Sequence, residues 1–217
     1  QRAGIFRHPN RQAIFLGDFV DHGPNQREVI EIVRPMLDER AALSVMGNHE
    51  FNAIAYFTQD PEDPDSYLRP HSEKNRKQHR AFLQAYEVED DYADLIEWFR
   101  SLPLWLDLEG LRIVHACWGG SLMRFLEGRH EGLNRRLSDE LLVAASRRES
   151  DEYRAVETLL KGEEIELPAG QSFRDKDCHP RQEIRVRWWD CEAKTYRKAF
   201  LGPQSAENHD SEDPINV

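Results

Sequence analysis

Two short polar blocks, each directly after an apolar run, constrain the fold of this chain more than any other feature. The first block, GDFVDHGP, covers 17–24 and follows the run AIFL at 13–16, and the second, GNHE, covers 47–50 and follows AALSVM at 41–46. The runs have the length of buried strands, and residues 25–40 between the blocks carry a helical pattern. A right-handed strand–helix–strand unit has parallel strands, so we expect both blocks at one edge of a sheet in an α/β fold, where ligands bind.

The rest of the chain shows a similar mixture of helical and strand patterns. Further helices are predicted over 51–58, 72–86, 90–101, 138–148 and 150–161, further strands over 104–108, 111–114 and 184–189, and a loop over 59–70. The Glu109-Gly110 pair predicts a hairpin turn, and the second hairpin strand leads into His115. A strand end therefore presents a third ligand-type side chain.

Composition limits the class of protein. The chain has 217 residues, 39% of them hydrophobic, three cysteines and a formal net charge of −11. This predicts one domain over 1–217 with an acidic loop at 203–214, and the negative charge disfavours binding to nucleic acid polymers. The absence of a long apolar run and of a leader pattern predicts a cytoplasmic protein without a membrane partner. The one basic cluster, on the helix predicted at 72–86, is either a solvated face or a lip that attracts an anionic substrate.

The cysteines give little evidence for a disulfide frame. They are odd in number and lack CxxC spacing, which indicates a reducing compartment. A zinc site built from Cys178, His179 and Cys191 is the alternative interpretation.

The polar blocks carry the side chains that a metal-assisted hydrolysis needs. The carboxylate of Asp18 can bridge two cations, Asn48 offers an amide oxygen and His115 an imidazole nitrogen, a mixture that suits manganese, iron, zinc or nickel. Such ions lower the pKa of bound water and hold the oxygens of a phosphoryl group during in-line displacement. His49 can protonate the leaving oxygen, and Asp21 can orient the ring of His49.

At these residues the sequence resembles the calcineurin-like metallophosphoesterases, and within them the bacterial serine/threonine phosphatase and diadenosine tetraphosphatase group. GDFVDHGP is similar to the family motif GDxVDRG, SVMGNHE to its GNHE motif and VHACW to its strand-borne histidine motif, in the right order over 12–118. The resemblance makes Asp18 the bridging ligand, with Asn48 and His115 as ligands of the second metal. It makes His49 the general acid and Asp21 its partner.

The resemblance also implies a fold and a reaction. The fold is a metallophosphatase-type β-sandwich flanked by helices, in four αββα layers. The reaction is phosphoester hydrolysis with two divalent metal ions, manganese favoured, on a phosphoprotein, a dinucleoside polyphosphate or a small phosphomonoester.

Three departures from the family pattern qualify these expectations. No Asp-x-His precedes Asp18 and no Gly-His follows His115, while His130, His179 and His209 stand in polar, turn-like contexts. We therefore expect a fragment of a longer reading frame, trimmed at both ends, that binds metal weakly and turns over poorly.

The third departure is His22, which stands where the family motif has arginine. Histidine lacks the forked donors of arginine, so we expect a weaker grip on phosphate that recovers as His22 gains a proton at lower pH. A noncatalytic binding module with the same fold is the alternative function.

Overall fold

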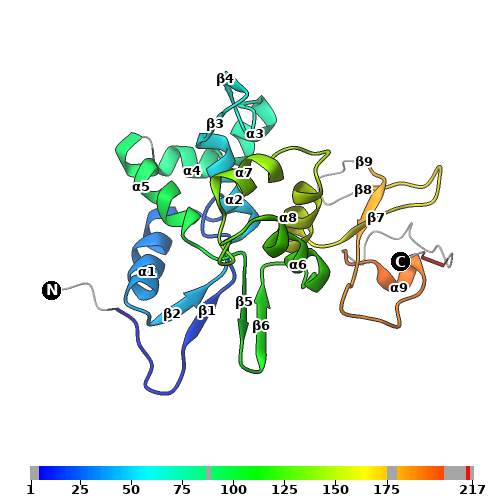
Figure 1. The fold of residues 1–217 in the computed structure, drawn as a ribbon, viewed down its shortest axis with the longest axis horizontal. Coiled ribbons are helices and arrows are strands. Elements are labelled where there is room, and N and C mark those ends of the chain that lie inside the picture. The colour runs from blue at the N-terminus through cyan, green and yellow to red at the C-terminus, as the bar shows by residue number, and fades with distance from the viewer. Residues whose placement is uncertain (1–4, 87–88, 175–179, 203–213, 216–217) are drawn as a thin grey trace. The chain divides into compact units, whose positions relative to one another are not determined.

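The computed structural model describes residues 5–86, 89–174, 180–202 and 214–215, with only the backbone for 89–91 (Figure 1). The chain divides into two compact units, Gln1–Leu160 and Lys161–Val217, and each is described by itself. The single domain over 1–217 stays a prediction. Cys178, His179, His209 and nearly all of the predicted acidic loop lie outside the described residues, and these include two of the three residues of the alternative zinc site.

The first unit contains the predicted strand–helix–strand arrangement. Strands β1 (Ala13–Phe15) and β2 (Ala42–Ser44) are parallel, with Ile14 opposite Leu43, and helix α1 (Gln26–Asp38) connects them (Figure 1). Both polar blocks therefore follow the carboxyl ends of neighbouring parallel strands, as the sequence predicts.

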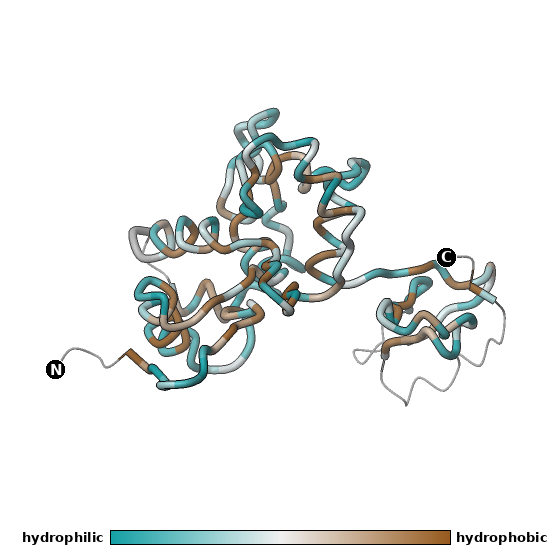
Figure 2. The backbone as a smooth tube through the Cα atoms, turned by 60° about the horizontal axis from the view of Figure 1, so that its bottom comes forward, coloured by the Kyte–Doolittle hydropathy of each residue, from teal (hydrophilic) through white to brown (hydrophobic). Residues whose placement is uncertain are grey.

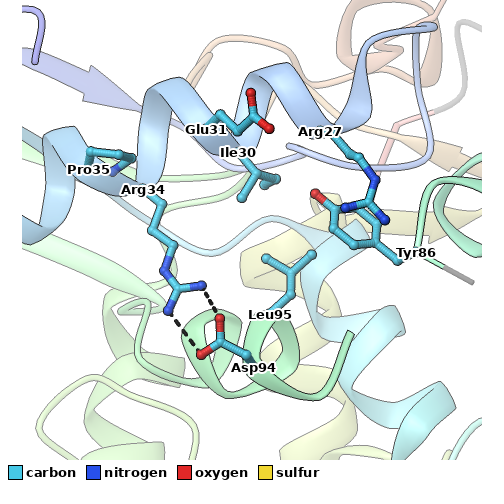
Figure 3. Close-up of a pocket in the computed structure, with 8 residues that line it drawn as sticks. All are labelled: Arg27, Ile30, Glu31, Arg34, Pro35, Tyr86, Asp94 and Leu95. Atoms are coloured by element: carbon cyan, nitrogen blue, oxygen red, sulfur yellow. Dashed lines mark hydrogen bonds and ion pairs between the residues drawn. The ribbon is translucent and has the colours of Figure 1, made fainter. Parts of the chain in front are cut away.

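Helix α1 is fixed against the helix that precedes the hairpin. Arg34 donates two hydrogen bonds to Asp94 of α5 (Glu89–Arg100), at 2.5 and 3.2 Å, and the guanidinium carbon of Arg27 lies 4.5 Å from the centroid of the Tyr86 ring (Figure 3). Ile30 and Leu95 are buried between these polar contacts. The first block leads into α1, so its carboxyl end is joined to a helix that these contacts hold in place.

Helix α2 (Asn48–Phe57) begins inside the second block, earlier than the helix predicted at 51–58. Asn48 and His49 therefore occupy its first turn. The segment predicted as a loop contains the hairpin β3 (Gln59–Asp60) and β4 (Asp63–Tyr67).

The helix predicted over 72–86 is wrong as a single element. It forms α3 (Glu73–Gln78) and α4 (Arg80–Ala85), with His79 between them at φ −88°, ψ 9°. His79 is fully buried there and reaches back to Asp21. A long-range contact thus accompanies the break.

The remaining elements of the first unit follow the sequence pattern with one addition. The predicted hairpin is β5 (Trp105–Leu108) with β6 (Leu111–Val114), and the predicted helix pair is α7 (Asp139–Ala145) with α8 (Asp151–Lys161). Helix α6 (Gly120–Arg129) was not predicted. Hydrophobic and hydrophilic positions alternate along α8 as its turns proceed (Figure 2), and Ala155, Val156, Leu159 and Leu160 are buried in the main core.

The second unit has its own small core. Strands β7 (Glu164–Glu166) and β10 (Glu183–Arg185) pair antiparallel, β8 (Phe173–Arg174) pairs with β9 (Pro180–Arg181), and α9 (Tyr196–Ala199) follows. Ile184 and Val186 are buried and Arg185 and Arg187 are exposed, so the predicted alternation is confirmed although β10 is shorter than 184–189.

Together these elements make a mixed α/β protein, consistent with a metallophosphatase fold. Among the described residues each sheet has two strands, and a four-layer sandwich is not seen. In the same residues, no helix has the length and apolar character needed to cross a membrane.

Candidate metal and catalytic site

The two polar blocks lie against each other because the side chain of Glu50 binds both of them. Its Oε2 accepts the backbone N–H groups of Asp18 at 2.8 Å and Gly47 at 2.9 Å, and its Oε1 accepts that of Phe19 at 2.7 Å. Glu50 is fully buried, and burial raises its pKa, although the three N–H donors favour the ionised form. Glu50 is part of the GNHE motif, but no role was predicted for it from the sequence.

The blocks also need glycine where they meet. A Cβ on Gly47 would overlap the carboxylate and the backbone nitrogen of Asp18, and a Cβ on Gly17 would overlap the backbone of Gly47. Close packing of the two loops therefore explains both glycines.

Asp18 and Asp21 both adopt the left-handed backbone conformation, with φ of 58° and 71°. Such a conformation is costly for residues with a Cβ and persists where neighbours enforce it. At Asp21 the neighbour is Gln26, whose Oε1 accepts the Asp21 N–H at 2.8 Å and whose Nε2 donates to the carbonyls of His22 and Gly23. No role was predicted for Gln26, the buried first residue of α1.

The predicted ligands Asp18 and His115 lie together. His115 Nε2 is 3.5 Å from Asp18 Oδ2, and His115 Nδ1 donates to the backbone carbonyl of Leu16. Burial alone would lower the pKa of His115, but its contact with Asp18 leaves that pKa raised; burial would raise the pKa of Asp18, and His115 leaves it lowered.

This pair fits a divalent cation. Two ligand atoms that bind the same ion at about 2.1 Å lie roughly 3.0–3.5 Å apart when the angle between them at the ion is between a right angle and the tetrahedral angle. The separation of Asp18 Oδ2 and His115 Nε2 agrees with this range. Metal-bound histidines commonly donate their other ring N–H to a backbone carbonyl, as His115 does to Leu16.

The third predicted ligand, Asn48, opens α2 beside this pair. The N–H of the next residue, His49, donates to Asp18 Oδ1 at 3.3 Å, which brings the start of α2 next to the Asp18 carboxylate. Within the described parts of the chain, no three histidine, cysteine, aspartate or glutamate side chains form a group that could hold a metal ion. Asn48 as a ligand stays a prediction.

The predicted acid and its partner are hydrogen-bonded. His49 Nδ1 donates to Asp21 Oδ2 at 2.9 Å, and only 9% of the His49 side chain and 1% of the Asp21 side chain are exposed. Burial alone would lower the pKa of His49, but the bond to Asp21 and the charge of Asp18 leave it raised. The raised pKa favours the protonated form of the ring, which is the form that an acid requires.

His22 contacts the other side of this ring. The two Nε2 atoms of His22 and His49 are 3.1 Å apart, and the rings meet edge to face with centroids 4.5 Å apart. When His49 carries a proton on Nε2, His22 is its acceptor. The sequence predicted a phosphate contact for His22, which stays a prediction.

A further histidine joins the site. His79 Nδ1 donates to the same oxygen of Asp21 at 2.8 Å. No sequence signal marks His79, since it stands in a run of basic and polar residues without motif spacing.

Comparison with known proteins identifies the family of this chain. Residues 3–180 match the model of the calcineurin-like phosphoesterase family, so the chain belongs to that family, whose members generally use two divalent metal ions.

Among individual relatives, the bis(5'-nucleosyl)-tetraphosphatase PrpE (asymmetrical) of Oceanobacillus iheyensis is 27% identical over 114 residues, 52% of this chain and 44% of the relative. Two symmetrical bis(5'-nucleosyl)-tetraphosphatases each match over 50% of this chain and 34% of their own length: that of Aromatoleum aromaticum at 36% identity and that of a Janthinobacterium species at 32%. The aligned region thus spans less than half the length of these relatives.

Proposed function

We propose that the protein is a metal-dependent phosphoester hydrolase. The observation that carries this proposal is the double contact of Asp18. One of its oxygens faces the Nε2 of His115, and the other accepts the backbone N–H of His49, the candidate acid. A candidate metal ligand and a candidate proton donor are therefore adjacent, as phosphoryl transfer to water requires.

In this mechanism Asp18, Asn48 and His115 would hold a divalent ion. When bound, such ions supply an activated water and stabilise the charge on the phosphoryl group. His49 donates the proton on Nε2 to the leaving oxygen, and Asp21 keeps the ring oriented through Nδ1 and stabilises its charge. Protonation of a leaving group in this way contributes about 10²- to 10⁴-fold in rate.

His22 has two roles in the proposal. Its Nε2 lies within hydrogen-bond distance of His49 Nε2, so the leaving oxygen must replace it as the acceptor of the acid proton. Once displaced, His22 would contact the phosphoryl group, because it stands where the family motif has a phosphate-binding arginine.

Substrate and architecture follow from the same proposal. Relatives named as dinucleoside tetraphosphatases favour a dinucleoside polyphosphate over a phosphoprotein or a small phosphomonoester. We propose manganese as the metal, the cytoplasm as the location, and a phosphorylated substrate without nucleic acid polymers or membranes as partners.

The parallel pair β1–β2 and the hairpin β5–β6 would belong to the two sheets of a four-layer sandwich.

Two observations favour a second candidate, a noncatalytic binding module. His22 stands where the family motif has arginine. Among the described residues, no three histidine, cysteine or acidic side chains form a group that could hold a metal ion. Such a module would keep the fold and bind phosphorylated ligands without turnover.

Hydrolysis of p-nitrophenyl phosphate and diadenosine tetraphosphate, with and without Mn²⁺, separates the two candidates. The hydrolase hypothesis predicts Mn²⁺-dependent turnover that Asn48→Ala abolishes, whereas Asn10→Ala, at an exposed position outside both blocks, retains it. Binding of either compound by folded protein without turnover would favour the binding module instead.

A further inference from the structure

The side chain of His79 is buried in a way that the proposed reaction does not use. Only 1% of it is exposed, and its Nδ1 lies 2.8 Å from Asp21 Oδ2. The same oxygen accepts His49 Nδ1 at 2.9 Å. Two imidazole rings, from segments thirty residues apart, therefore share one carboxylate oxygen.

The hydrogen-bond chemistry fixes the tautomer of both rings. An ionised carboxylate only accepts, so His49 and His79 each carry a proton on Nδ1. Burial raises the pKa of Asp21, but its bonds to the two histidines leave it lowered, which keeps it ionised. Among the described residues, neither Asp21 Oδ1 nor His79 Nε2 has a hydrogen-bond partner.

Core packing alone does not account for His79. A buried ring nitrogen without a partner costs free energy, and an apolar side chain of similar size would fill the space without that cost. The edge of the Tyr56 ring contacts His79, with centroids 5.1 Å apart, and supplies no hydrogen bond to Nε2 in that arrangement. What His79 adds is its bond to Asp21.

We propose that His79 is a positioning residue for the general acid His49, acting through Asp21. The torsion that turns a carboxylate about its Cβ–Cγ bond is broad, so a bond to His49 alone would let the two groups turn together. A second donor, fixed between α3 and α4, removes that freedom. Asp21 is then held where His49 Nε2 points toward the leaving oxygen.

This inference rests on the proposed function and predicts a specific kinetic signature. A phosphoester with a good leaving group, such as 2,4-dinitrophenyl phosphate, needs little help from an acid, whereas phenyl phosphate needs its leaving oxygen protonated. Loss of His79 should therefore slow phenyl phosphate hydrolysis much more than dinitrophenyl phosphate hydrolysis. A residue that only supports the fold would affect both substrates alike.

The test compares two variants of the Mn²⁺-loaded protein. His79→Phe fills the space without a donor, and His79→Asn places an amide N–H at the same number of bonds from the backbone as Nδ1. We expect His79→Phe to lower kcat for phenyl phosphate roughly 10- to 100-fold, with little change for dinitrophenyl phosphate. His79→Asn should recover most of the loss.

The control is His71→Phe. His71 is partly buried and stacks on Tyr56 with centroids 3.9 Å apart, but its Nε2 bonds to the Tyr56 carbonyl. It should not change the ratio of the two rates. If His79→Phe folds and slows both substrates equally, or neither, the inference is overturned.

A second readout separates this inference from the proposed function. NMR of ¹⁵N-histidine-labelled protein reports the Nδ1–H proton of His49 directly. If His79 positions Asp21, this signal broadens or disappears in His79→Phe and returns in His79→Asn, even in a protein that hydrolyses neither ester. Turnover by the parent protein with an unchanged His49 signal in His79→Phe would leave the hydrolase intact and refute the role of His79.

Discussion

Replacing Glu50 should separate the two polar blocks, because one carboxylate joins them. It accepts N–H groups from Asp18 and Phe19 in the first block and from Gly47 in the second. In Glu50→Gln the single amide oxygen can occupy the Oε2 position and keep the bonds from Asp18 and Gly47. The NH₂ group then faces the N–H of Phe19, donor against donor.

The structure sets the size of the effect. A hydrogen bond to a charged group contributes about 1.5–3 kcal/mol, so Glu50→Gln should lower the free energy of unfolding by at least that amount. Glu50→Ala leaves all three N–H groups without the carboxylate, at about 1–3 kcal/mol each. This loss is comparable with the roughly 5–15 kcal/mol total stability of an ordinary domain, so we expect Glu50→Ala to fold poorly.

Urea unfolding followed by tryptophan fluorescence measures the difference. The matched control is Glu28→Gln on the exposed face of α1, which should change the free energy of unfolding by less than about 0.5 kcal/mol. If Glu50→Gln and Glu28→Gln unfold at the same urea concentration, Glu50 does not hold the blocks together.

Three further predictions concern the site and its surroundings. Gly47→Ala should weaken Mn²⁺ binding in a calorimetric titration, because the new Cβ meets the Asp18 carboxylate, whereas Gly128→Ala, with nothing within 4 Å, should leave it unchanged. His22→Arg should raise kcat/KM for p-nitrophenyl phosphate at pH 8 by about tenfold, the equivalent of a gained charge-assisted bond; no change would exclude His22 from the phosphate subsite. Arg147 lowers the pKa of Asp60 from 3.8 to about 2, so this ion pair stabilises the fold above pH 3.8 and is lost as the pH falls toward 2. Asp60→Asn should therefore melt below the parent at pH 6 and converge with it near pH 2, and a gap that persists unchanged at pH 2 would contradict this pKa.

Local patterns in the sequence were sufficient to predict the two parallel strands and the helix that position the polar blocks. Apolar runs of strand length before each block, with a helix between them, predicted the parallel pair β1–β2. The grouping of Asp18 with His115 and of Asp21 with His49 was implied by the resemblance of the motifs to a known family, and in the structure the members of each pair lie close together. The strand–helix–strand relation depends on the periodicity of apolar residues, which a sequence displays.

Contacts between distant segments were beyond such reasoning. His79 interrupts a predicted helix where it reaches Asp21, 58 positions away, and the role of Glu50 depends on three backbone groups that meet only after folding. Helix α6 was missed for a different reason: it contains Gly120 and Gly128, and glycine has a low helix propensity.

The central claim is that Asp18 and His115 bind a common divalent ion. Electron spin-echo spectroscopy of the Mn²⁺-loaded, ¹⁵N-histidine-labelled protein tests it most directly, because a coordinated imidazole nitrogen couples to the electron spin of the metal. We predict one such coupling in the parent protein and its loss in His115→Ala. Bound Mn²⁺ without a nitrogen coupling, or a coupling that survives His115→Ala, would contradict the account.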